Sequence, residues 1–285
     1  MQIKEELTIL VKGILMGSAD IIPGVSGGTI ALIVGIYERL VNSLKDIPKF
    51  LIPLGKWKLK DAWTEFWKID FALFIPLALG IGSAFLAGSY VITFLMEDYP
   101  AYIYAFFFGL ILASVRVVHR RIKEHKIFDM IHALAGFILA FWIVGLPILK
   151  ITPSYWFIFL CGMIAICAML LPGISGAFMM LMLGQYKFML DALHSLKLGY
   201  IFSFAAGAGI SLIGSSWILS YLLKKHHGKT MYFLTGLMIG ALRQPFENVV
   251  YAPGMEWNIL QILLVTAFAA IGVVIVIVID RYEKV

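Results

Sequence analysis

A Pro-Gly pair interrupts an apolar stretch near the start of the chain, in the run Ile22-Pro23-Gly24-Val25-Ser26-Gly27-Gly28-Thr29. Proline lacks the amide that a continuous helix would bond, and the glycines that follow leave the backbone uncovered. A related run, Leu171-Pro172-Gly173-Ile174-Ser175-Gly176, lies in the second half of the chain. Any fold for this sequence therefore has to accommodate two broken helices of similar design.

Composition assigns both breaks to a membrane. Of the 285 residues, 61% are apolar and 14% are charged, whereas a soluble domain carries about 25% charged residues. Several apolar segments approach or exceed the roughly 20 residues needed to cross a bilayer; they are 71–96, 101–118, 128–149, 200–223 and 257–279. We expect an all-α integral membrane protein, in which exposed backbone at a break has to be satisfied by the protein or by a ligand.

The two halves of the chain align with each other. Two windows match without gaps: 22–44 with 171–193, and 80–116 with 207–243. We therefore predict two repeats, 1–150 and 151–285, each with a broken helical hairpin followed by three transmembrane helices. The second arms of the two hairpins are expected to be continuous helices over about 26–44 and 174–193. The first repeat carries an insertion at 45–70, whose alternating Lys and Trp residues predict an amphipathic segment at the membrane interface.

Loop charges predict how the two repeats lie relative to each other. Positive residues concentrate on the cytoplasmic side, and the acidic Glu97-Asp98 loop corresponds to the basic Lys224-Lys225 loop. Two copies inserted in opposite directions explain this reversal, with both termini and the segments 45–70, 119–127 and 224–229 cytoplasmic. Each hairpin is then either re-entrant or fully spanning. We favour the re-entrant form, because it brings the two breaks together near the midplane, as in inverted-repeat transporters.

The broken helices predict an anion-binding site. A helix that begins after Pro-Gly presents its first amides and a partial positive charge, and serine and threonine hydroxyls add donors. Two such ends facing each other would hold an oxyanion, with contacts from Gly24, Val25, Ser26, Gly27, Gly28, Thr29, Gly173, Ile174, Ser175 and Gly176. The alternative is a pair of kinks tolerated for packing, with the serines bonding their own backbone.

Charged residues near the breaks extend this prediction. Arg116 and Arg243 occupy corresponding positions at the ends of corresponding predicted spans and suit bidentate phosphate contact. Arg116 could instead extend to the membrane interface. Asp20 lies in an apolar context where a carboxylate is costly. It either takes part in ion coupling or caps the broken helix. Glu38 and Arg39 form a local ion pair at the membrane face or contact the substrate.

The sequence offers little that an enzyme needs. It contains no metal-ligand cluster, no nucleotide-binding loop and no paired carboxylates, so we expect neither a metal nor another cofactor. The net charge of +6 predicts orientation in the membrane and contact with anionic lipids rather than nucleic-acid binding. These features favour transport over catalysis.

Three runs resemble the bacterial polyprenyl-phosphate transporter family, long catalogued as a membrane domain of unknown function: GSADIIPGVSGGT at 17–29, GIYERL at 35–40 and LPGISG at 171–176. The resemblance covers essentially the whole chain. It implies return of undecaprenyl phosphate from the outer to the inner leaflet of the bacterial plasma membrane. If Asp20 takes part in coupling, H+ or Na+ is the candidate ion. Ala177 and Phe178 stand where the first run has Gly28 and Thr29, so the second break would offer fewer donors.

Two other functions are compatible with the same residues. One is a carrier of a small anion or of an ion-coupled polar solute. The other is a membrane-embedded enzyme acting on a lipid phosphate. Stabilisation by long-chain polyprenyl phosphate but not by inorganic phosphate would exclude the first, and product formation by the purified protein in detergent would indicate the second.

Overall fold

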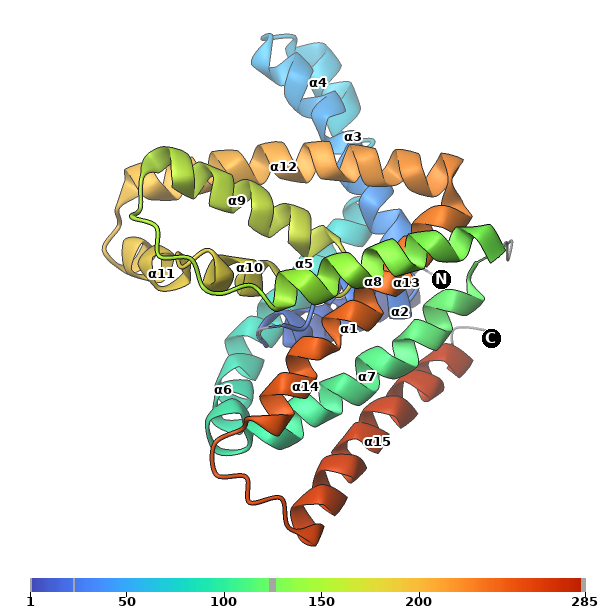
Figure 1. Ribbon diagram of the computed structural model, residues 1–285. Helices are drawn as coiled ribbons and strands as arrows, with labels where there is room; N and C mark the ends of the chain where they lie inside the picture. The colour runs from blue at the N-terminus through green and yellow to red at the C-terminus, as the bar shows by residue number, and fades with distance from the viewer. Residues whose placement is uncertain (1, 23, 123–126, 283–285) are drawn as a thin grey trace.

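The computed structural model describes residues 2–22, 24–122 and 127–282, in which every regular element is helical (Figure 1). Pro23, part of the first predicted break, lies outside the described residues. The helices, including one π-helical and one 3₁₀ segment, are α1 Gln2–Asp20, α2 Gly27–Ile33, α3 Tyr37–Gly55, α4 Leu59–Phe66, α5 Phe71–Ser83, η1 Ala84–Gly88, α6 Ser89–Asp98, α7 Pro100–Arg120, η2 Ile127–Asp129, α8 Met130–Val144, α9 Tyr155–Leu170, α10 Gly176–Met182, α11 Tyr186–His194, α12 Leu198–Lys225, α13 His227–Ala241, α14 Arg243–Val250 and α15 Ile259–Tyr282.

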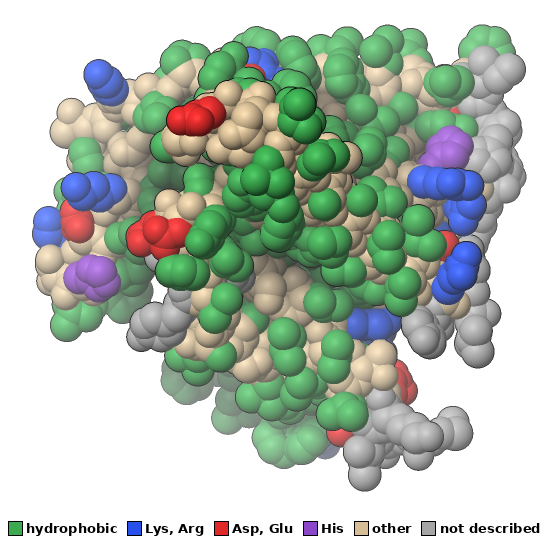
Figure 2. All heavy atoms as spheres, turned by 90° about the horizontal axis from the view of Figure 1, so that it is seen from below, with side chains coloured by type: hydrophobic (Ala, Val, Ile, Leu, Met, Phe, Trp, Pro, Cys, Tyr) green, Lys and Arg blue, Asp and Glu red, His purple; other side chains and the backbone are tan. Residues whose placement is uncertain are grey.

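Four helical segments within the described residues are long and apolar enough to cross a membrane: Phe71–Gly88, Pro100–Arg120, Leu198–Lys225 and Ile259–Arg281. On the face seen in Figure 2, hydrophobic side chains cover most of the middle, and Lys and Arg side chains gather at two edges. Such a surface suits contact with lipid between two aqueous boundaries. The prediction of an all-α, multi-pass membrane protein is confirmed.

Each predicted hairpin contains a second break. Gly35, with φ +72°, separates α2 from α3, and Gly184, with φ +69°, separates α10 from α11. The predicted continuous helices over 26–44 and 174–193 are therefore wrong. A left-handed glycine ends each of the short helices after about two turns, which is a common way for a helix to end.

The first short helix runs back along the helix that precedes it. At one end of α2, the amide of Gly27 donates to Asp20 Oδ1 of α1 at 2.7 Å. At the other end, Lys12 Nζ, from the middle of α1, donates to the carbonyl oxygen of Val34. The chain thus enters along α1, turns at the break and returns along α2 beside the same helix.

The segment predicted to lie at the membrane interface is helical. Helix α3 extends to Gly55, and α4 follows, so that the two project from the rest of the bundle (Figure 1). Trp57, Trp63 and Trp67 on this projection are exposed. Indole rings prefer the head-group region of a bilayer, and interfacial contact of 45–70 stays a prediction.

Three predicted spans differ from the observed helices. The span predicted over 71–96 contains the π-helical turn η1 between α5 and α6. The span expected to end at Arg243 stops at Ala241, and α14 begins at Arg243. Residues 145–154 form an irregular connection where the span 128–149 was expected to continue. Apolar residues continue beyond Ser83 and Val144, so hydropathy did not reveal those two ends, whereas the residues after Ala241 include Arg243, Gln244 and Glu247.

Glycines allow close packing of α1 against α5 and of α9 against α12. A Cβ at Gly80 would lie 2.2 Å from the carbonyl oxygen of Leu10, and one at Gly207 would lie 2.0 Å from that of Phe159. Gly80 and Gly207 are aligned positions of the two halves. Aligned glycines thus make the same kind of contact, each with the first helix of its own half.

A second pair of contacts joins one half of the chain to the other. Helix α7 lies beside α15, and α13 lies beside α8 (Figure 1). Gly109 packs on the backbone of Ala269, and the aligned Gly236 packs on the backbone of Ala133. The last long helix of each half therefore packs on the other half, so the two halves cannot separate as independent bundles.

Candidate functional site

The two breaks meet inside the bundle. Thr29 Oγ1 accepts a hydrogen bond from the amide of Gly173 at 2.8 Å. Ser26 Oγ lies 3.4 Å from the carbonyl oxygen of Leu171, to which it donates. Segments from opposite halves of the chain therefore contact each other through the polar groups of the two motifs.

Both breaks have the same local structure. Gly24 and Gly173 have φ values of +90° and +93°, a region that side-chain-bearing residues rarely adopt. Ser26 caps α2 by accepting from the amide of Gly28 at 3.2 Å, and Ser175 caps α10 by accepting from the amide of Phe178 at 3.4 Å. The serines thus bond their own backbone in this structure.

The first amides of α2 are bonded within the protein rather than free, which differs from the prediction. Asp20 Oδ1 takes the amide of Gly27, so Asp20 caps α2. Its other oxygen, Oδ2, is buried and has no hydrogen-bond partner within the described part of the chain. Because a buried carboxylate oxygen without a partner is costly, Asp20 is the most unusual polar group at the first break.

The break residues are packed tightly. Those that are buried are Gly24, Val25, Ser26, Gly27, Gly28, Thr29, Gly173, Ile174 and Ser175, and Gly176 is half-buried. The side chain of Gln244, on α14, covers the first break: a Cβ at Gly24 would lie 2.3 Å from Gln244 Cδ. Sequence reasoning missed Gln244, and nothing in its local sequence indicates this position.

The structure does not bring the two predicted arginines to the breaks. Arg243 pairs with Glu247 at 2.7 Å, donates to the carbonyl oxygen of Phe141 at 3.0 Å and lies over the ring of that residue. Arg116 is exposed on α7. Arg243 therefore holds α14 against the end of α8, and contact of either arginine with a substrate stays a prediction.

Glu38 and Arg39 make side-chain contacts between helices. Glu38 Oε1 lies 3.1 Å from His227 Nε2. Arg39 contacts Asp70 at 2.7 Å and Glu5 at 2.8 Å. The hydrogen bond from Arg39 holds the pKa of Asp70 below its usual value. These contacts connect α3 to α1, α13 and the residue that precedes α5. Both residues thus contact partners on other parts of the chain rather than each other, and contact of either with the substrate stays a prediction.

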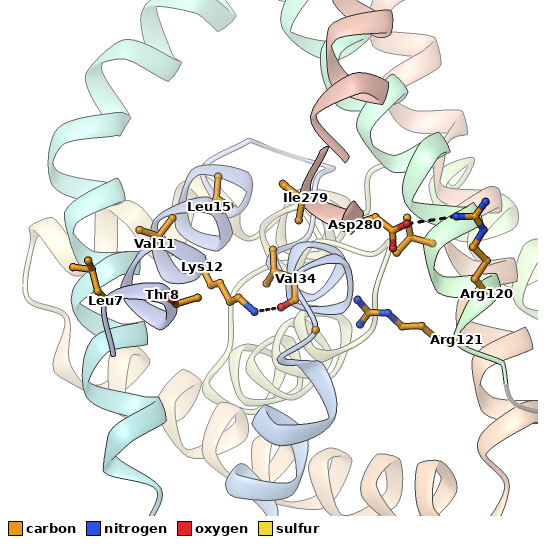
Figure 3. A pocket seen from close by; sticks show the side chains of 12 residues that line it. Leu7, Thr8, Val11, Lys12, Leu15, Val34, Arg120, Arg121, Ile279 and Asp280 are labelled. Carbon is orange, nitrogen blue, oxygen red and sulfur yellow. Dashed lines mark hydrogen bonds and ion pairs between the residues drawn. The ribbon is translucent and has the colours of Figure 1, made fainter. Parts of the chain in front are cut away.

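A cavity of about 910 Å³ opens beyond the C-terminal end of α2 (Figure 3). Lys12, Arg120 and Arg121 line it together with apolar side chains. Sequence reasoning assigned 119–127 only to a cytoplasmic loop and overlooked Lys12. An isolated lysine inside the apolar run Ile9-Leu10-Val11-Lys12-Gly13-Ile14 was the available signal, because charges within membrane helices are usually functional.

Residues 16–256 match the family model described as Undecaprenyl phosphate translocase-like. The chain belongs to this family. The match includes both breaks, Gln244, and the Arg120-Arg121 pair. The resemblance seen in the sequence is thereby confirmed.

Two relatives carry the name polyprenyl-phosphate transporter. A protein from Vibrio cholerae is 41% identical over 83% of this chain and 76% of its own length. A protein from Staphylococcus aureus is 29% identical over 95% of each chain. No solved structure matches the chain significantly. The described contacts therefore have to be interpreted from this structure alone.

Proposed function

We propose that this protein transports undecaprenyl or another polyprenyl phosphate across the bacterial plasma membrane, returning it from the outer to the inner leaflet. Membership of the translocase-like family and the names of the two relatives support the substrate class. An enzyme would form product in detergent, because catalysis needs no second compartment. We expect no product from this protein, because the relatives are named transporters.

The proposed architecture is a pair of inverted repeats, 1–150 and 151–285, with re-entrant hairpins. The direction of the first helices supports it. Glu38, beside Arg39, contacts His227 next to the C-terminal end of α12, and Arg39 contacts Glu5 at the start of α1. At the other end of α12, Ser203 donates to the carbonyl oxygen of Tyr155 at the start of α9.

Helices α1 and α9 thus begin near opposite ends of α12, whose 28 residues extend about 40 Å at 1.5 Å per residue. From there both helices lead to the breaks, which meet between them. In the proposed topology both termini and the basic segments 45–70, 119–127 and 224–229 face the cytoplasm, because positive charge concentrates on that side.

The contact between the two breaks is the observation that carries the proposed mechanism. Thr29 and Gly173 join the halves in the interior by one hydrogen bond, so a relative movement of the repeats would act on this contact. In the proposed cycle the head group reaches the breaks when that contact opens, and the amides and hydroxyls of both motifs bind it. The isoprenoid tail stays in the surrounding lipid.

Asp20 is the proposed coupling group. Its Oδ1 caps α2 and its Oδ2 is buried and without a hydrogen-bond partner among the described residues. A proton or Na+ on this carboxylate would change the bond to Gly27 and thereby loosen the start of α2. Coupling to H+ would make net transport depend on the pH difference across the membrane.

Reconstitution into liposomes tests this function. The full-length protein is inserted into vesicles that contain undecaprenyl phosphate, and the lipid in each leaflet is measured with and without a pH gradient. We expect the protein to accelerate transfer between leaflets, and Asp20→Asn to remove the dependence on the gradient. Transfer no faster than in protein-free vesicles would exclude the proposal, and uptake of inorganic phosphate alone would indicate a small-anion carrier.

A further inference from the structure

The cavity at the end of α2 has one charged wall. Lys12 of α1, Arg120 at the end of α7, Arg121 directly after it, and Asp280 of α15 line it (Figure 3). Arg120 Nη1 lies 3.5 Å from Asp280 Oδ2, a long contact for an ion pair. Three cationic side chains against one carboxylate leave an excess of positive charge, which suits a phosphate group.

Two of these cations are held in place by the C-terminal end of α2. Arg121 donates to the carbonyl oxygens of Leu32 at 2.8 Å and Ile33 at 3.0 Å. Lys12 Nζ donates to the carbonyl oxygen of Val34 from the other side (Figure 3). Carbonyls at a helix end carry partial negative charge. They therefore fix both cations at the edge of the cavity before any ligand arrives.

Apart from Thr8, the rest of the cavity wall is apolar, and it continues into the bundle. Leu15, Val34 and Ile279 line both this cavity and a neighbouring one of about 120 Å³. The smaller cavity reaches Ile30 of α2 and Phe107 of α7, and only apolar side chains line it. A ligand that fills both spaces needs a charged end and a hydrocarbon part.

The cavity is open along its α1 wall. Leu7 and Val11 line it, yet their side chains are 62% and 49% exposed on the outside of the bundle. In a membrane this outer face contacts lipid, so a hydrocarbon chain can enter from the bilayer without crossing a polar region. Arg120, Arg121 and Asp280 lie at the C-terminal ends of α7 and α15, near the proposed cytoplasmic boundary.

We propose that this cavity binds the head group of polyprenyl phosphate on the cytoplasmic side, with Lys12, Arg120 and Arg121 contacting the phosphate and the first isoprene units in the apolar extension. The proposal rests on the proposed function and assigns to it a binding site separate from the two breaks. Since α2 joins this cavity at one end to Asp20 and Thr29 at the other, ligand binding here has a direct route to the contact between the breaks.

Ligand-dependent thermal stability of the full-length protein in non-ionic detergent tests the site. The probes are farnesyl phosphate, farnesol and inorganic phosphate, titrated at equal concentrations. We expect farnesyl phosphate to stabilise the protein and the other two to have no effect. Arg120→Gln and Arg121→Gln should weaken farnesyl phosphate binding at least tenfold, and Arg120→Lys should recover part of the loss. Lys60→Gln on α4, also a change of an exposed cation, is the matched control and should bind normally.

The apolar extension has its own variant. Leu15→Trp should fill the space shared by the two cavities and weaken binding of farnesyl phosphate, whereas Leu79→Trp, at an exposed position on α5, should not. Arg121→Gln could fail to fold, because α2 would lose its cap. Arg120→Gln then tests the site, since the side chain of Arg120 is 50% exposed and its loss should not unfold the protein.

Unchanged farnesyl phosphate binding in Arg120→Gln and Leu15→Trp would overturn the proposed site, and so would equal stabilisation by inorganic phosphate. Leaflet transfer in liposomes separates this failure from that of the proposed function. Transfer by the wild-type protein together with normal binding by the variants would reject only the cavity, whereas no transfer by the wild-type protein would reject the function on which it rests.

Discussion

Gly24 and Gly173 have nearly the same backbone conformation, and each is followed by a serine that caps a seven-residue helix. The side chains around them differ. Asp20 caps the first short helix, and Met169 occupies the aligned position before the second break. The two halves thus have similar backbone breaks, but a charged group is built into only one of these two aligned positions.

The far ends of the two short helices differ in the same way. Lys12 and Arg121 bond the last carbonyls of α2. At the end of α10, the backbone amide of Leu149 donates to the carbonyl oxygen of Met182 at 2.8 Å. A neutral backbone contact therefore replaces two cations. The comparison teaches that backbone geometry positions the breaks, whereas the ligand chemistry we propose depends on side chains of the first half.

The largest expected effect tests whether the two halves share their packing. Gly80→Ala and Gly207→Ala each place a Cβ within 2.2 Å of a backbone oxygen of the neighbouring helix. Overpacking of this kind costs about 1–3 kcal/mol. We expect similar losses in both variants, measured as the change in thermal unfolding in detergent.

Gly82→Ala and Gly209→Ala are matched controls on the same helices, because a Cβ at either position meets open space. They should be neutral or should stabilise the protein by up to about 1 kcal/mol through helix propensity. A loss of stability in Gly80→Ala without one in Gly207→Ala would mean that the aligned glycines contribute differently to helix packing. It would weaken the proposal of repeats.

The next effect concerns the bond that joins the two breaks. Thr29→Val keeps the shape of the side chain but removes the acceptor of the buried Gly173 amide. An unpaired buried amide costs about 1–3 kcal/mol, and transport should change along with stability. Thr64→Val, at an exposed threonine on α4, should leave stability and transport unchanged. Equal effects of Thr29→Val and Thr64→Val would contradict a role of the Thr29–Gly173 bond in transport.

The two capping serines should differ by a smaller amount. Ser26→Ala removes a cap and a donor to Leu171, whereas Ser175→Ala removes a cap only. Loss of a cap costs about 0.5–2 kcal/mol, so the Ser26 variant should unfold at the lower temperature. Ser154→Ala removes an exposed cap of α9 and provides the reference. A larger loss at Ser175 would reverse the comparison between the breaks.

The smallest expected effect concerns the charged side chains that contact α3 in the first half and α11 in the second. Arg39 pairs with Asp70 in the first half, and Lys197 lies over the ring of Phe188 in the second. Because the pKa of Asp70 is lowered in the folded protein, its contribution is present above the usual carboxylate pKa of about 4 and is lost as the pH falls through the lowered value.

Partly exposed pairs contribute about 0–1 kcal/mol. We therefore expect thermal stability to fall slightly in acid, and Asp70→Asn to show less of this fall than the wild-type protein. Lys197→Gln should keep the full acid dependence, because the contact of Lys197 with the ring of Phe188 involves no carboxylate. An acid dependence that is the same in all three proteins would assign it to other carboxylates.

Several expectations from the sequence depended only on local composition. The membrane class follows from the apolar fraction, and the breaks at Gly24 and Gly173 follow from residues that cannot continue a helix. The family resemblance is confirmed by the match over residues 16–256. Gly35 and Gly184 were equally visible in the sequence, but the left-handed turn at each became apparent only in the structure.

The sequence by itself thus determined the breaks at Gly24 and Gly173 and the membrane environment of the helices, because both depend on neighbouring residues and on the solvent around them. Only the tertiary structure decided which groups meet: Thr29 with Gly173, Asp20 with Gly27, and Arg243 with Glu247 rather than with a break. It also brought Lys12 and Arg121 to one cavity. Contacts between distant parts of a chain depend on how its helices pack, and apolar segments of similar composition carry little information about that packing.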